Sequence, residues 1–252
     1  MTKKISELFN FKNKVIIITG CSGQLGRELS DFFVKNNSIV YGLDKIKPRN
    51  SKIKFIKCDI VEDKELKKVI KKIYSKHKTI NILINNAAVS FFQNFKYRNL
   101  KNFKETISTN LYAPFNAIKF LSANSKKRDN LKIINISSIY GVVTPNFSIY
   151  SKGDRFNSEI YGASKAALIQ ITKYFGNLLA NKNICVNCIS PGGIENLNLQ
   201  KKKFIKKYNK NVPKNRLAKT TDFLAAVAFL SSDFSNYTTG QNIVIDGGLS
   251  LK

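Results

Sequence analysis

The run K-V-I-I-I-T-G-C-S-G-Q-L-G, from Lys14 to Gly26, decides the fold of this chain. Its first half, up to Thr19, is a continuous apolar run of strand length, and the glycines at positions 20, 23 and 26 follow directly. An amphipathic helical pattern, R-E-L-S-D-F-F-V, comes next. A glycine turn between a strand and a helix lets backbone N–H groups and the helix N-terminus approach a pyrophosphate. The run therefore predicts a nucleotide-binding α/β domain.

Strand and helix signals alternate along the rest of the chain. Strand-type apolar runs recur at 38–44, 53–58, 81–84 and 132–136, and helical patterns cover 62–76 and about 100–123. This alternation is typical of a parallel sheet with helices on both faces. A chain of 252 residues is long enough for one well-buried domain and rather short for two. We therefore predict an α/β fold in which residues 1–252 form a single domain, a doubly wound parallel sheet of the Rossmann type.

The choice of nucleotide depends on the end of the second expected strand, where Asp44 lies. A carboxylate at this place accepts hydrogen bonds from the adenosine ribose hydroxyls and repels a 2′-phosphate, which favours NAD over NADP. The adjacent Lys45 supports the alternative, because a cation there can accept the phosphate. NAD is the predicted cofactor, and NADP is the alternative.

A second stretch carries groups suited to proton transfer. Y-G-A-S-K, from Tyr161 to Lys165, begins an apolar-periodic helix, and Ser138 lies upstream in I-N-I-S-S-I-Y-G. Side chains four residues apart project from one face of a helix, so the lysine lies beside the phenol. A neighbouring cation lowers the pKa of a tyrosine, and Ser138 adds a hydroxyl. Together they suit proton transfer to or from an alcohol or carbonyl oxygen. Y-x-x-x-K alone is a weak signal in a lysine-rich chain.

Jointly these motifs resemble the short-chain dehydrogenase/reductase family over nearly the whole chain. The resemblance implies reversible hydride transfer between a nicotinamide and a secondary alcohol or ketone. It gives Tyr161 the role of general acid or base, with Lys165 lowering its pKa and holding the nicotinamide ribose. Ser138 would bind the substrate oxygen, and Asn110, in S-T-N-L-Y-A, would anchor a water-linked proton relay.

The same resemblance implies a set of cofactor contacts. They come from the glycine loop, the acid after the second strand, the D-I pair, the N-N-A-A motif, the Tyr/Lys helix and the loop P-G-G-I. The implied cofactor-binding residues are Gly20, Ser22, Gly23, Gln24, Leu25, Gly26, Asp44, Asp59, Ile60, Asn86, Ala87, Ala88, Tyr161, Lys165, Pro191, Gly192 and Ile194.

Three features depart from the family pattern. Gln24 stands where compact members have a glycine, and Gly23 is an additional glycine. The separation of Ser138 from Tyr161 is longer than is usual in the family. The loop after Pro191 reads G-G-I-E-N where a threonine is common, and Asn196 is a candidate substitute.

The longer segment, 139–160, is expected to form one wall of the substrate pocket, because its ends are tied to Ser138 and Tyr161. Residues 193–215 form the second expected substrate-side segment. Polar side chains in the first segment predict a polar, anionic, sugar-type substrate, with phosphate contacts from Lys152 and Arg155 and hydroxyl contacts from Asn146, Ser148, Ser151 and Asn157. A surface loop or a subunit contact is the alternative. Tyr150 is a competing phenol, but Asp154 follows it where a lysine is needed.

These features are compatible with three functions. T-G-x-x-G-x-L-G-R-E, S-S-I-Y-G and the long segment are similar to bacterial oxidoreductases of surface-glycan and flagellin-sugar pathways. A 3-oxoacyl-carrier-protein reductase is the second reading, in which surface lysines receive the acidic carrier. A non-catalytic nucleotide-binding regulator is the third. Family members commonly form homodimers or homotetramers, so we expect one of these assemblies.

Composition argues against several partners. The formal net charge is +27, but only six of the 43 basic residues are arginine, so we expect no nucleic-acid partner. The apolar runs are too short to span a membrane, and no export signal is evident, so a cytoplasmic location is expected.

Cys185 and Cys188 form a lone C-x-x-C in a strand pattern, which predicts no metal site. His77 is the single histidine, which weakens a Ser-His-Asp triad.

Overall fold

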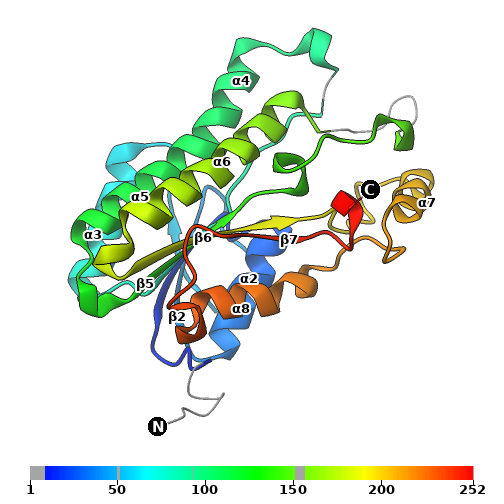
Figure 1. The fold of residues 1–252 in the computed structure, drawn as a ribbon. Coiled ribbons are helices and arrows are strands. Elements are labelled where there is room, and N and C mark those ends of the chain that lie inside the picture. The colour runs from blue at the N-terminus through cyan, green and yellow to red at the C-terminus, as the bar shows by residue number, and fades with distance from the viewer. Residues whose placement is uncertain (1–8, 50–51, 93, 151–156, 252) are drawn as a thin grey trace.

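The computed structural model describes residues 9–49, 52–92, 94–150 and 157–251 (Figure 1). Its sheet has seven parallel strands in the order β3-β2-β1-β4-β5-β6-β7. The strands are β1 (Val15–Thr19), β2 (Ile39–Asp44), β3 (Lys54–Lys57), β4 (Ile82–Asn85), β5 (Leu131–Ile136), β6 (Ile184–Pro191) and β7 (Asn242–Ile245).

Helices cover both faces of the sheet. They are α2 (Gln24–Lys35), α3 (Asp63–His77), α4 (Leu100–Ile107), α5 (Ala113–Asn124), α6 (Glu159–Leu178), α7 (Lys202–Asn211) and α8 (Leu224–Ser231). Helices α3, α5 and α6 lie on one side, and α2 and α8 lie on the other (Figure 1). Alternate residues of β1 point to the two cores, so Ile17 packs with the α3 side and Ile18 with the α2 side. The predicted fold class is confirmed.

The strand order reverses between β1 and β4, and this reversal positions the site. Strand β1 pairs with β2 on one edge and with β4 on the other, both parallel. The chain thus runs outward from β1 to β3 and then returns to begin the second half at β4. In open α/β sheets, ligands bind at the carboxyl ends of the strands beside such a reversal.

The expected helix at about 100–123 differs in one respect. A π-helical turn, Ser108–Tyr112, separates α4 from α5 and contains Asn110. Pro114 is tolerated because it lies in the first turn of α5, where its missing N–H is not needed. Among the described residues, no helix is both long and apolar enough to cross a membrane.

Candidate active site

Ser138 and Tyr161 are brought together by a close backbone contact. Ser138 follows β5 and precedes the 3-10 turn Ile139–Gly141. A Cβ atom on Gly141 would lie 2.7 Å from the Lys165 carbonyl carbon, and one on Gly162 would lie 2.9 Å from the Tyr140 carbonyl oxygen. The turn can therefore rest directly on the first turns of α6, which carry Tyr161 and Lys165.

The side chain of Lys165 is buried, and Tyr161 is half-buried. Burial raises the pKa of Tyr161, and a side-chain hydrogen bond with Ser138 acts in the opposite direction. Burial also lowers the pKa of Lys165 to about 8. Lys165 Nζ donates a hydrogen bond to the Ile136 carbonyl oxygen at 2.7 Å and lies 5.7 Å from the centroid of the Tyr161 ring.

This arrangement differs from the expectation that Lys165 lowers the pKa of Tyr161. The amine is directed to a backbone carbonyl and to the ring, and burial dominates the pKa of the phenol. In the protein alone, Tyr161 is therefore a protonated phenol at neutral pH.

Asn110 is held inside the protein by its own amide. Its Oδ1 accepts a hydrogen bond from Val89 N at 2.9 Å, and its Nδ2 donates to Val89 O at 3.0 Å and to Ser164 Oγ at 3.1 Å. Ser164 Oγ in turn donates to the Tyr161 carbonyl oxygen at 2.8 Å. Asn110 therefore joins the segment after β4 to the helix that carries the tyrosine. π-Helical turns of this kind are frequent at functional sites.

The glycine loop follows β1 as expected. Gly20 has φ +66°, and a Cβ atom on Gly26 would lie 2.1 Å from the Gly20 carbonyl oxygen, so the loop folds tightly on itself. The Asn86 side chain donates to the carbonyl oxygens of Thr19 and Gly20, at 3.1 and 3.0 Å. These bonds join the ends of β1 and β4 at the strand-order reversal.

One cavity, of about 460 Å³, lies beside the glycine loop. Asp44 lies in its wall, where the carboxylate accepts hydrogen bonds from Ser22 N at 3.0 Å and Ile46 N at 3.2 Å. Lys45 Nζ lies 2.7 Å from an Asp59 oxygen. Lys45, whose charge was the reason to keep NADP as the alternative cofactor, is thus paired with the carboxylate of Asp59. The expected cofactor-binding residues that line this cavity are Gly20, Gly23, Gln24, Leu25, Gly26, Asp44, Asp59, Ile60, Asn86, Ala87 and Ala88.

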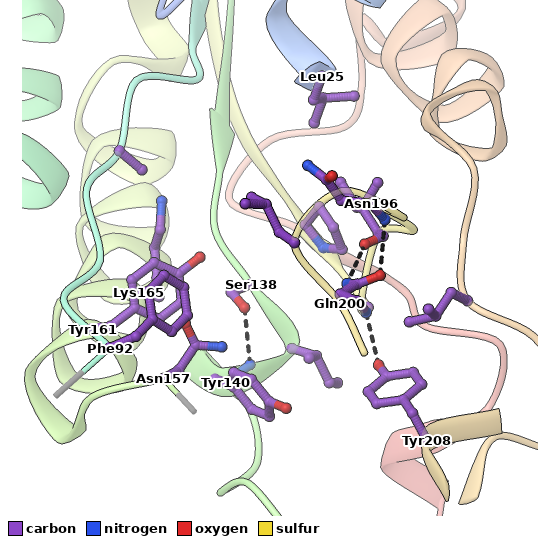
Figure 2. Close-up of a pocket in the computed structure, with 18 of the residues that line it drawn as sticks. Leu25, Phe92, Ser138, Tyr140, Asn157, Tyr161, Lys165, Asn196, Gln200 and Tyr208 are labelled. Carbon is purple, nitrogen blue, oxygen red and sulfur yellow. Dashed lines mark hydrogen bonds between the residues drawn. The ribbon is translucent and has the colours of Figure 1, made fainter. Parts of the chain in front are cut away.

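A second cavity, of about 580 Å³, lies beside the Ser/Tyr/Lys group (Figure 2). Tyr161, Lys165 and Phe92 lie on one side of it, and Asn196, Gln200 and Tyr208 lie on the other (Figure 2). The expected site residues that line it are Leu25, Asn86, Ala88, Ser138, Tyr161, Lys165, Pro191, Gly192 and Ile194.

Two expected site residues, Ser22 and Asn110, line neither cavity. Ser22 is engaged with the chain after β2, because its N–H donates to Asp44 and its hydroxyl donates to the Ile46 carbonyl oxygen. All the amide atoms of Asn110 are used in protein contacts, as described above.

The segment 139–160 contributes to the larger cavity with one expected residue, Asn157, and with two tyrosines that were not expected to line it. Tyr140, Tyr150 and Asn157 line it. Asn146 instead caps a 3-10 turn by accepting from Ser148 N at 3.0 Å, and its amide donates to Asn211 at the end of α7. Lys152, Arg155 and Ser151 lie outside the described residues. The expected hydroxyl contacts from Asn146 and Ser148 are therefore wrong, because these side chains serve the turn.

An aromatic wall of the larger cavity was not expected from the sequence. The hydroxyls of Tyr140 and Tyr150 are 3.1 Å apart, and the Tyr150 ring stacks on Phe204 with centroids 5.5 Å apart. Tyr208, on α7, accepts a hydrogen bond from Gly193 N at 2.7 Å. The available signal was the spacing of Phe204 and Tyr208, which are one helical turn apart in a lysine-rich stretch.

The chain is similar to known oxidoreductases over almost its whole length. The family model described as enoyl-(acyl carrier protein) reductase matches residues 42–250. The 3-oxoacyl-[acyl-carrier-protein] reductase of Thermotoga maritima is 29% identical over 253 residues, which cover 95% of this chain and 99% of that protein.

The chain is also similar to solved structures of dehydrogenases over almost its whole length. A short-chain dehydrogenase from Leptospira borgpetersenii with bound NAD⁺ has a TM-score of 0.91 and 34% identity, with 99% of this chain and 97% of that chain covered. The ligand-free aldohexose dehydrogenase of Thermoplasma acidophilum has a TM-score of 0.85 and 26% identity, with 97% of each chain covered.

Proposed function

The chain belongs to the short-chain dehydrogenase/reductase family, and we propose from this that it transfers hydride between NAD and a secondary alcohol or ketone. The observation that carries the proposal is that Ser138, Tyr161 and Lys165 line one cavity, next to a second cavity at the glycine loop. The two cavities share Leu25, Asn86 and Ala88 in their walls, so together they suit an elongated dinucleotide with its reactive end near Tyr161.

The glycine loop fits the pyrophosphate of NAD. A Cβ atom on Gly23 would meet only the Gly20 carbonyl oxygen, at 3.4 Å, so open space lies in front of the loop. Gly23 also caps α2 without a side-chain hydrogen bond. The cap residue therefore supplies no side-chain partner to the first N–H groups of α2, and a phosphate at a helix N-terminus supplies one.

Each residue of the group has a role that its surroundings support. Burial keeps the phenol of Tyr161 protonated, so it can donate a proton to a carbonyl oxygen and take one back in the reverse direction. The Ser138 hydroxyl hydrogen-bonds the same substrate oxygen. Lys165 and Asn110 hold α6 and the preceding segments in place through the contacts described above. NAD, when bound, supplies or accepts the hydride.

We propose a sugar-type substrate for the larger cavity, whose walls come from segments 139–160 and 193–215. Phenol rings combine an apolar face with a hydroxyl, and Tyr140, Tyr150 and Tyr208 present this combination beside the Asn157 amide. The likeness to an aldohexose dehydrogenase supports this class. A site built to bind hydroxyls rejects analogues that lack them.

A 3-oxoacyl thioester is the second candidate substrate. The curated relative from Thermotoga maritima is named for this activity, and Leu199, Phe204 and Leu217 give the cavity apolar wall area for an acyl chain. A turnover screen with NAD and NADP against aldoses, sugar phosphates, nucleotide sugars and 3-oxoacyl thioesters distinguishes the two classes. If the protein turned over none of these secondary alcohols and ketones, the result would count against the proposed reaction.

Replacing the phenol tests the catalytic assignment. We expect Tyr161→Phe to lower kcat by a factor of about 100 to 10,000, because general acid–base catalysis contributes about that much. Binding of NADH, measured by titration of its fluorescence, should change little, since the ring is retained.

Tyr150→Phe is the matched control. It removes a phenol hydroxyl from the same cavity but not the one beside Lys165. If Tyr150→Phe were the inactivating change and Tyr161→Phe stayed active, the assignment of the acid and base would be wrong.

A further inference from the structure

Gln24 connects the glycine loop to the far side of the site. It is the first residue of α2, and its Nε2 donates a hydrogen bond to the Glu195 carbonyl oxygen at 2.6 Å. Its Oε1 accepts from Asn196 Nδ2 at 3.4 Å. We call these two hydrogen bonds the Gln24 clamp. They join parts of the chain that lie 171 and 172 residues apart in the sequence.

The segment held by the clamp is itself well braced. Glu195 N donates to the Ala218 carbonyl oxygen at 2.9 Å, and the Gln200 side chain accepts from Asn196 N at 2.8 Å. The Gln200 amide also donates to the Ile194 carbonyl oxygen at 2.9 Å. Because residues 194–200 are bonded to one another, fixing Glu195 fixes the position of the segment as a whole.

The clamp lies where the two cavities meet. Gln24 lines the cavity at the glycine loop, and Asn196 lines the larger cavity beside Tyr161. Leu25 and Asn86 line both cavities, so they mark the junction between them. A dinucleotide that occupies both cavities has to pass through this junction.

We propose that Gln24 is a positioning residue that holds segment 194–200 over the cofactor and slows the exchange of NAD. This inference rests on the proposed use of NAD. A glycine, which the family pattern has at this position, has no side chain to form the clamp. An amide is needed because one bond requires a donor and the other an acceptor, and a carboxylate provides only the acceptor. NAD enters or leaves when the clamp opens.

The test compares two variants with the unmodified protein. Gln24→Met keeps the length of the side chain and removes both hydrogen bonds. Glu195→Ala is the matched control, because the clamp uses the backbone carbonyl of Glu195 and not its carboxylate. The measurements are the NADH dissociation rate by stopped-flow fluorescence without substrate, hydrogen exchange of residues 194–200 in the cofactor-free protein, and KM and kcat with the substrate found in the screen.

We expect Gln24→Met to raise the NADH dissociation rate about threefold to tenfold, the effect of losing one or two neutral hydrogen bonds. Exchange of the 194–200 amides should become faster, and KM should rise. Asn196→Ala removes only the longer bond, so it should give a smaller change in the same direction. Glu195→Ala should match the unmodified protein.

Two results would overturn the inference in distinguishable ways. If Gln24→Met bound NADH normally and its dissociation and exchange rates were unchanged, the proposed role of the Gln24 clamp would be wrong. The proposed function would be unaffected. If the unmodified protein did not bind NADH at all, the proposed function would fail and the clamp with it. Circular dichroism of each variant checks that the fold is retained.

Discussion

Lys165 is only 2% exposed, and its burial sets a dependence of stability on pH. Its pKa falls from 10.5, the value it has in the unfolded chain, to about 8 in the folded protein. Between these pH values the unfolded chain keeps the proton and the folded protein has lost it. The unfolded state then binds more protons, so the contribution of Lys165 to the free energy of unfolding rises with pH across this window. Below the window the unfavourable burial of the charge is fully present.

Lys165→Met should remove this pH dependence. The free energy of unfolding of the unmodified protein, minus that of the variant, should rise by up to about 3 kcal/mol from neutral pH to the end of the window. Urea denaturation at a series of pH values measures both. Taking the difference cancels the titration of the other lysines, and a difference that did not vary with pH would contradict the burial of a charged amine.

Asp44 and its neighbours predict that the protein prefers NAD to NADP. The carboxylate faces the cavity at the glycine loop, and the cation of Lys45 is paired with Asp59. We expect the unmodified protein to bind NAD more tightly than NADP, as titration of both cofactors measures. Asp44→Asn keeps the shape and removes the charge, so it should reduce the ratio of the two affinities about tenfold to a hundredfold, the worth of hydrogen bonds to a charged group.

Lys45→Ala is the control for this prediction. It should leave the order of the two affinities unchanged, because Lys45 is engaged by Asp59. Tighter binding of NADP by the unmodified protein would show that a cation overrides Asp44.

The π-helical turn between α4 and α5 carries Asn110 into the interior, where it is 0% exposed. The turn places one amide so that it serves both Val89 and Ser164. An uninterrupted α-helix would rotate the following residues relative to α4, so this element determines how the helix α5 and the segment after β4 meet α6.

Asn110→Ala should therefore lower the free energy of unfolding by about 2 to 4 kcal/mol, because it removes the amide that bonds both backbone groups of Val89 and one of the two hydrogen-bond partners of Ser164. Urea denaturation measures the loss. Asn124→Ala is the matched control: its amide donates to the Phe120 carbonyl oxygen at an exposed helix end, so its removal should cost less than about 1 kcal/mol. Equal losses in the two variants would contradict a special role for the π-helical turn.

Most of the fold of the whole molecule could be predicted from the sequence, because strands buried on both faces are continuous apolar runs. The first strand was expected at 14–19 and is Val15–Thr19, and the fifth was expected at 132–136 and is Leu131–Ile136. Residues at or just after the end of a strand, such as Asp44 and Ser138, were found for the same reason, since their place follows from the strand itself.

The rest of the site depends on contacts that periodicity does not contain. The clamp joins Gln24 to a segment far along the chain, and the aromatic wall brings Tyr150 against Phe204 on α7. The direction of the Lys165 amine likewise depends on a carbonyl from β5. The sequence pattern of a single helix or strand indicates which of its faces is buried. It does not indicate which residue from a distant part of the chain contacts that face.

The contact of Gly141 with α6 has a consequence for how such an enzyme is diversified. It involves backbone atoms alone, and Gly162 makes the reciprocal approach to Tyr140. The residues between these two anchor points and before Tyr161 can therefore be exchanged, shortened or lengthened without moving Tyr161. A laboratory that wished to retarget the enzyme would randomise this segment and leave the two glycines untouched, much as antibody loops vary on a constant framework.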